Sequence, residues 1–187
     1  MEREGAAHKD LDWGHVIYLN NSAATVDIGE RSITIFGSPV TLDCGTWAFQ
    51  YPPIRDVWTG RVPRGTGVLL THGPAKGHLD SSLRKGCGWL GNELWRTKPR
   101  LVVCGHIHQA RGREDVNWDY LQRVYDGVQS GHLGIISVLG MLVVFAISKI
   151  WYKVSGGMPV GTTTFVNAAV VGGPGNSESH PATTVEI

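Results

Sequence analysis

Short apolar runs bounded by glycine or proline recur along the chain. Residues 68–70 (Val-Leu-Leu) and 101–103 (Leu-Val-Val) are rich in leucine and β-branched side chains, without polar alternation. Runs of this length and composition are typical of strands buried on both faces of a parallel sheet. Other short runs with strand-like composition also predict strands. They cover residues 16–20, 23–28, 32–36 and 162–170.

Two further segments repeat apolar residues at helical spacing. Between Cys87 and Lys98 the repeat brings Leu90 and Leu94 onto one stripe, and a proline then stops it. Residues 116–128 repeat in the same way and predict a second amphipathic helix. We expect the first helix to cover a sheet, and strands alternating with helices predict an α/β fold.

The longest apolar stretch begins near residue 131. Residues 127–148 contain no Asp, Glu, Lys or Arg, and with the following aromatic residues the segment 131–152 approaches the roughly 20 residues that span a bilayer. A complete crossing conflicts with a return of 162–170 to the same sheet. Insertion into one leaflet, a hairpin-like excursion broken at Gly140, and packing on the protein itself all remain open. Residues 172–187 are rich in Gly, Pro and Ser and predict a surface tail.

Histidines follow both of the buried runs directly. They lie in the strings Thr71-His72-Gly73-Pro74 and Gly105-His106-Ile107-His108. Loops at the carboxyl ends of neighbouring parallel strands open onto a common crevice, so His72, His106 and His108 are candidate metal ligands. Clustered imidazoles favour zinc, iron or manganese over calcium or magnesium. The alternative is that each is an ordinary core or loop histidine.

A polar loop follows the first of these strings. Its His78 and Asp80 could face a substrate phosphate or solvent, and nothing in the local pattern fixes the direction of either side chain. We expect a solvated loop.

The order of these motifs resembles the C-terminal half of a calcineurin-like metallophosphoesterase. Within that superfamily it is most similar to the metallophosphoesterase-domain-containing subgroup, and the match runs with gaps from about Val16 to Ala169. The matching strings are Ile17–Asn20, Ile33–Pro39, Gly45–Phe49, Thr71–Pro74, Gly86-Cys87, Cys104–His108 and Phe165–Ala169.

This resemblance implies an α/β two-sheet sandwich flanked by helices, with residues 1–130 and 160–171 as its C-terminal portion and the N-terminal part missing. It also implies a phosphatase or phosphodiesterase acting on a small phosphoester through two divalent ions, Mn, Fe or Zn. His72 and His106 would bind one ion, and His108 would bind the other.

Three motifs of that family are absent from the sequence. These are an Asp-x-His, a Gly-Asp and a Gly-Asn-His followed by Asp or Glu, all of which precede the histidine strings in the family. Three imidazoles without a bridging carboxylate leave the repulsion between two cations uncompensated, so we expect one ion or none and little activity. A truncated gene model, a cropped fragment and a degenerate protein would all show this pattern. The competing hypothesis is a non-catalytic protein that uses 131–152 as a membrane anchor or interaction segment.

Composition narrows the remaining function classes. The net charge is +1 and the basic residues are scattered, which argues against nucleic-acid binding. The cysteines are Cys44, Cys87 and Cys104, an odd number without metal-binding spacing, and they predict buried free thiols in a reducing compartment. The first residues contain no apolar signal core, so we expect a cytoplasmic protein, membrane-associated only through 131–152.

Overall fold

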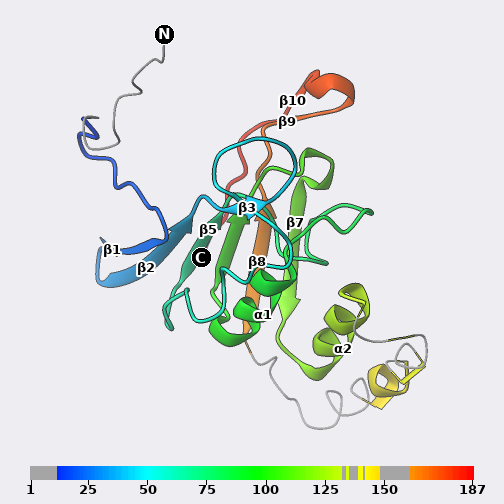
Figure 1. The fold of residues 1–187 in the computed structure, drawn as a ribbon. Helices are drawn as coiled ribbons and strands as arrows, with labels where there is room; N and C mark the ends of the chain where they lie inside the picture. The colour runs from blue at the N-terminus through cyan, green and yellow to red at the C-terminus, as the bar shows by residue number, and fades with distance from the viewer. Residues whose placement is uncertain (1–11, 132–133, 135–138, 141, 148–160) are drawn as a thin grey trace.

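A six-stranded sheet forms the centre of the computed structural model, which describes residues 12–131, 134, 139–140, 142–147 and 161–187. The strand order is β1-β2-β5-β6-β8-β7 (Figure 1). Strands β2, β5, β6 and β8 run parallel, and β1 and β7 pair antiparallel at the two edges. The strands are β1 (Ser22–Ile28), β2 (Arg31–Ser38), β5 (Val68–Thr71), β6 (Leu101–Cys104), β7 (Gly112–Asn117) and β8 (Thr162–Asn167).

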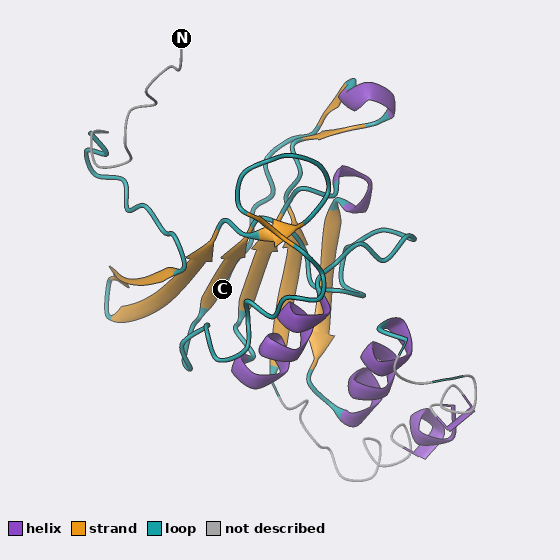
Figure 2. Cartoon of the chain, in the orientation of Figure 1, coloured by secondary structure: helices purple, strands orange, loops and turns teal. Residues whose placement is uncertain are grey.

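Smaller elements surround this sheet (Figure 2). Two short ribbons pair β3 with β4 and β9 with β10, the second of which projects beyond the end of the sheet. The ribbon strands are β3 (Thr41–Leu42), β4 (Gln50–Tyr51), β9 (Val171–Gly172) and β10 (Glu178–Ser179). The helices with defined bounds are α1 (Gly88–Thr97) and α2 (Tyr120–Gln129), together with single turns at His108–Ala110 and Pro174–Asn176.

Most of the predicted elements are confirmed. The hairpin of β1 and β2 turns at residues 29–30, and strands cover the runs at 68 and 101 and most of 162–170. Helix α1 begins after Cys87, whose sulfur accepts a hydrogen bond from the backbone N–H of Leu90, and it ends at Lys98 in a left-handed conformation.

One predicted strand is absent, and one predicted helix is present but begins later than expected. Residues 16–20 form no strand, because β1 already occupies the edge of the sheet and they have no strand partner there. The helix predicted over 116–128 begins later, since β7 extends to Asn117 by pairing with β8. The side chain of Asp119 then caps α2 by accepting a hydrogen bond from the backbone N–H of Gln122.

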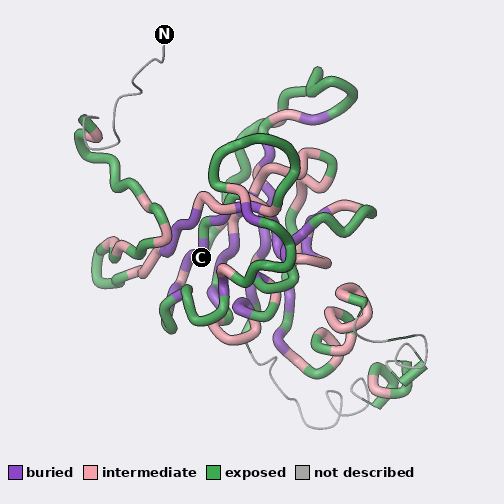
Figure 3. Tube along the Cα trace, in the orientation of Figure 1, coloured by how far each residue is buried: buried purple, intermediate pink, exposed green. Residues whose placement is uncertain are grey.

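The predicted α/β architecture is confirmed, with a mostly parallel sheet. Among the residues that the structure describes there is one large sheet with two small ribbons, rather than the two large sheets expected from the resemblance. The principal core lies on one face of this sheet. Figure 3 shows that buried residues are concentrated along the central strands. Four aligned side chains, one from each parallel strand, pack against Leu90 and Leu94 of α1. They are Phe36, Leu69, Val102 and Phe165.

The opposite face of the sheet has a smaller core. Val68, Leu101 and Val166 are buried there, with partly buried side chains such as Ile33 and Val185 packed beside them. Parallel sheets in proteins are usually covered on both faces. This face has fewer buried side chains than the face covered by α1, so it is the less completely covered of the two.

Most of the apolar segment 131–152 lies outside the residues that the structure describes. The three interpretations of this segment therefore stay predictions. Within the described ranges, no helix combines the length and apolar character needed to cross a bilayer.

Candidate functional site

The histidine strings meet at one edge of the sheet. His72 follows β5 and His106 follows β6, and these neighbouring strands are parallel, with Leu70 opposite Val103. The two histidines therefore leave the sheet side by side. Nε2 of His72 lies 3.1 Å from Nδ1 of His106, and the ring centroids are 4.7 Å apart.

A tight turn aims the second imidazole. The backbone N–H of Gly105 donates to the carbonyl of His72 at 3.0 Å, and that of Ile107 donates to the carbonyl of Gly105 at 2.7 Å. His106 itself has a φ of +66°, a left-handed conformation that is uncommon for a residue with a side chain. The unusual backbone conformation is thus located at the residue that contacts His72.

The other nitrogen of His106 faces a thiol. Cys44, two residues after β3, places its sulfur 3.4 Å from Nε2 of His106, and the side chain of Gln50 donates a hydrogen bond to that sulfur at 3.2 Å. Cys44 is exposed, which corrects the prediction that every thiol is buried, whereas Cys87 and Cys104 are buried as expected. The ribbon of β3 and β4 carries Cys44 to the histidines, and no local sequence signal shows this.

His108 lies apart from this pair. It begins the single turn at 108–110, and its Nδ1 lies 2.7 Å from the side-chain oxygen of Asn176. The structure therefore brings His72 and His106 into contact and places His108 beside the C-terminal hairpin instead.

The pair suits two ligands of one ion. Two imidazole nitrogens 3.1 Å apart would both be in reach of one ion such as zinc, which histidine nitrogens bind in proteins. In the part of the chain that the structure describes, no group of three or more His, Cys, Asp or Glu side chains is arranged to hold a metal ion. Cys44 does not complete the set, because it faces the opposite nitrogen of His106. The described residues do not fit a complete two-metal site.

Electrostatics favour the neutral form of His106. Partial burial lowers the pKa of its imidazole, and the nearby His72, His108 and Lys85 lower it further. A neutral imidazole has the free lone pair with which histidine binds a metal ion.

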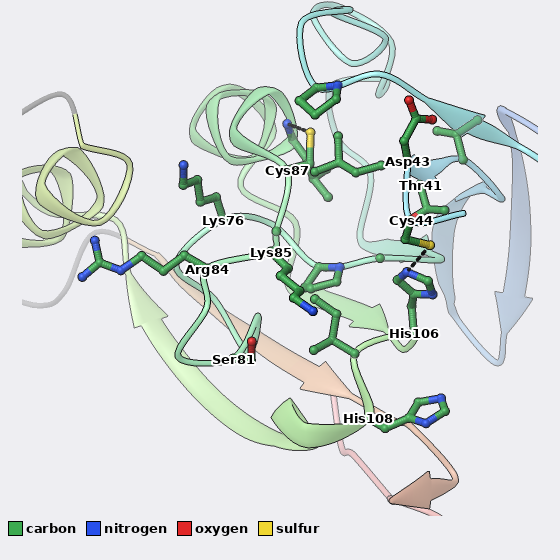
Figure 4. A pocket seen from close by; sticks show the side chains of 18 of the residues that line it. Thr41, Asp43, Cys44, Lys76, Ser81, Arg84, Lys85, Cys87, His106 and His108 are labelled. Atoms are coloured by element: carbon green, nitrogen blue, oxygen red, sulfur yellow. Dashed lines mark hydrogen bonds between the residues drawn. The ribbon is translucent and has the colours of Figure 1, made fainter. Parts of the chain in front are cut away.

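A pocket of about 800 Å³ opens beside His106 and His108 (Figure 4). Its lining includes one carboxylate, Asp43, and three cationic side chains from the loop between β5 and α1. The cations are Lys76, Arg84 and Lys85. Buried apolar side chains also line it, including Tyr51, Trp58 and Leu90. The pocket therefore combines a basic side with an apolar side.

The solvated loop predicted around His78 and Asp80 is wrong, because both side chains are buried. His78 is 3% exposed, lies 2.7 Å from Glu114 and 3.3 Å from Asp126, and stacks on Phe165. Burial by itself would lower the pKa of His78, but the hydrogen bonds to Asp126 and Glu114 outweigh burial and raise the pKa to about 9. A carboxylate oxygen of Asp80 accepts the backbone N–H of Gly86 at 3.0 Å, so both residues hold the loop in place.

Comparison with known proteins finds relatives that share part of their length with this chain. No family model matches. Metallophosphoesterase domain-containing protein 1 of Homo sapiens is 38% identical over 104 residues, 51% of this chain and 30% of the human protein. UPF0046 protein T07D4.2 of Caenorhabditis elegans is 35% identical over 115 residues, 58% of this chain and 28% of the worm protein.

A third relative matches nearly the whole chain. It is the probable rhamnogalacturonate lyase C of Emericella nidulans, which is 36% identical over 180 residues, 95% of this chain but 17% of that protein. The chain thus spans between about a sixth and a third of the length of the curated relatives it matches.

Proposed function

We propose that this chain contributes the histidine-bearing portion of a metal-dependent phosphoester hydrolase with a metallophosphoesterase-like fold. The observation that carries the proposal is the 3.1 Å pair of His72 and His106 at the carboxyl edge of two adjacent parallel strands. The metallophosphoesterase naming of a relative that matches about half of the chain supports the same assignment.

Each residue of the site has a distinct part in this proposal. His72 and His106 would hold the ion through Nε2 and Nδ1, and the contact of Cys44 with the far nitrogen of His106 fixes the orientation of the ring. A divalent ion bound there supplies a Lewis acid that polarises a phosphoryl oxygen. The pocket beside the pair orients the phosphoester, which we expect to be a small molecule.

The chain by itself is expected to bind one ion at most. A bridging carboxylate is needed to hold two cations a few ångströms apart, and none meets the histidine pair among the described residues. The name of the Emericella nidulans relative belongs to a whole protein of which this chain covers 17%.

Metal binding tests the proposal most directly. We expect wild-type protein to bind Mn²⁺ or Zn²⁺ in isothermal titration calorimetry, and His72→Ala or His106→Ala to weaken binding at least tenfold by removing a ligand. His15→Ala is the matched control, because His15 is an exposed imidazole outside the site. His108→Ala should have the smaller effect. Hydrolysis of p-nitrophenyl phosphate and of its diester with added Mn²⁺ should follow the same order.

Two results would contradict the proposal. Equal metal affinity in the wild type, His72→Ala and His106→Ala would show that the pair binds no ion. Absence of both metal binding and turnover in the wild type would instead favour the non-catalytic alternative, for which residues 131–152 would be the segment to test.

A further inference from the structure

The loop between β5 and α1 is a closed structure whose base is held by backbone hydrogen bonds. The N–H of Cys87 donates to the carbonyl of Pro74 at 3.0 Å, and the N–H of Lys76 donates to the carbonyl of Cys87 at 3.1 Å. Near the tip, the backbone carbonyl of Asp80 accepts the N–H of Lys85 at 3.3 Å. The side-chain carboxylate of Asp80 accepts the N–H of Gly86 at 3.0 Å. Residues 74–87, termed the basic loop below, are therefore held in a defined conformation.

One buried side chain, that of Asn167, also fixes the distance between the basic loop and the histidines. Asn167, at the end of β8, donates from one side-chain nitrogen to the carbonyl of Leu79 at 3.2 Å and to that of Ile107 at 2.9 Å. Leu79 belongs to the basic loop, and Ile107 lies between His106 and His108. A single amide thus connects the basic loop to the turn that carries His106 and His108.

All three cations of the pocket come from the basic loop, and one of them faces the histidines. Figure 4 shows Lys85 extending toward the side where His106 and His108 lie, whereas Lys76 and Arg84 extend to the other side. Arg84 also donates to the carbonyl of Gln129. Within the described residues, no carboxylate lies at ion-pair distance from Lys85. Its ammonium group is available to an anion.

The apolar side of the pocket is also rigid. Trp58 is 1% exposed and donates from its indole nitrogen to the hydroxyl of Tyr51 at 2.8 Å. Leu90 lies on the same pocket lining. At about 800 Å³ the pocket is in the size range of sites for organic ligands, which bury apolar surface and fix a few polar groups.

We propose that this pocket binds a phosphate monoester of an apolar or aromatic alcohol, with the phosphate on Lys85 beside His106 and the organic group against Tyr51, Trp58 and Leu90. A monoester dianion gains more from the basic loop than a diester monoanion does, because it carries more charge. This inference rests on the proposed function and adds the substrate class and Lys85 as a specificity residue.

Binding of phenyl phosphate to metal-free protein in EDTA tests the inference separately from catalysis. We expect Lys85→Gln to weaken the affinity about tenfold or more in calorimetry, the size of a lost charge-assisted hydrogen bond. Lys85→Arg should retain most of it. Arg64→Gln is the matched control, since it removes the same charge from an exposed residue that does not line the pocket, and should bind as the wild type does. Diphenyl phosphate and inorganic phosphate should both bind more weakly than phenyl phosphate.

Several outcomes would overturn the inference. Among them are no binding by the wild type, equal weakening by Lys85→Gln and Arg64→Gln, and equal affinity for phenyl phosphate and inorganic phosphate. Phenyl phosphate binding that depends on Lys85, in a protein that neither binds metal nor hydrolyses esters, would support this subsite while contradicting the proposed hydrolase function.

Discussion

Asn167 is a fully buried amide whose hydrogen bonds connect three segments of the chain. Besides its two donated bonds, its side-chain oxygen accepts the N–H of Ala169 at 3.2 Å. Asn167→Leu keeps the number and branching of the side-chain heavy atoms but leaves the carbonyls of Leu79 and Ile107 without this partner, so we expect the free energy of unfolding to fall by about 3 kcal/mol. Urea denaturation measures this change. Asn92→Leu, at an exposed residue of α1, should change it little, and comparable losses in both variants would contradict the role given to Asn167.

His78 gives the molecule a pH-dependent stability. The pKa of His78 is raised to about 9 in the folded protein, above the unfolded value of about 6.5. The protonated side chain therefore adds to the free energy of unfolding fully below pH 6.5, and this stabilisation is lost as the pH rises through 9. The total loss should be about 3 kcal/mol. His78→Gln should be less stable than wild type at pH 6, and the difference should shrink toward pH 9.5. Thermal unfolding followed across this range checks it, and a difference that does not depend on pH would contradict it.

At the scale of elements, the two helices differ in how they are held. Leu90 and Leu94 of α1 are buried, whereas α2 has no buried residue and is held by contacts near its surface. Among them, Asp126 accepts the indole N–H of Trp95 at 2.7 Å. We therefore expect the amides of α2 to exchange with deuterium about tenfold faster than those of α1, because local opening of α2 exposes little apolar surface.

Asp126→Asn should widen this difference. It removes the charge that faces His78 and weakens the contact with Trp95, so exchange in 120–129 should accelerate while exchange in 88–97 stays near the wild-type rate. Hydrogen-exchange mass spectrometry resolves the two peptides. Equal acceleration in both helices would mean that Asp126 stabilises the whole domain rather than α2.

On the scale of the whole molecule, the two faces of the sheet are unequally covered. The smaller core includes partly buried Val185 near the C-terminus, and Leu70 is 37% exposed. We expect Val185→Asp to uncover this face, which would raise the fluorescence of the dye ANS and increase aggregation on heating. Leu83→Asp is the control, because Leu83 is 67% exposed and belongs to neither core. A response that is the same in both variants would show that this face is already covered.

Local sequence patterns predicted the elements that are stabilised by contacts between residues close in sequence or by packing of apolar side chains. The strands at 68 and 101, the helix capped by Cys87 and the convergence of two strand ends could all be inferred this way. Strand β7 could not, because its sequence is polar and its pairing is completed across the sheet, where the hydroxyl of Thr164 donates to Asp115 at 2.6 Å.

Long-range contacts explain the remaining errors at the site. Cys44 meets His106 across 62 positions of sequence, and His78 meets Glu114 across 36. The burial of His78 depends on having a carboxylate on each side of its ring, and those carboxylates come from β7 and α2. No short window contains all three groups, so the sequence alone could not distinguish this histidine from one in a solvated loop.

The left-handed backbone at His106 means that the residue suited to binding lowers the stability of the fold. A side chain in that conformation costs about 1–2 kcal/mol, which glycine does not incur. Replacing His106 by glycine would remove this cost, but it would also remove the contacts of the imidazole with His72 and Cys44. In related proteins that no longer bind a ligand at this site, we expect glycine at the position of His106. The residue found there would then indicate whether a relative still uses the site.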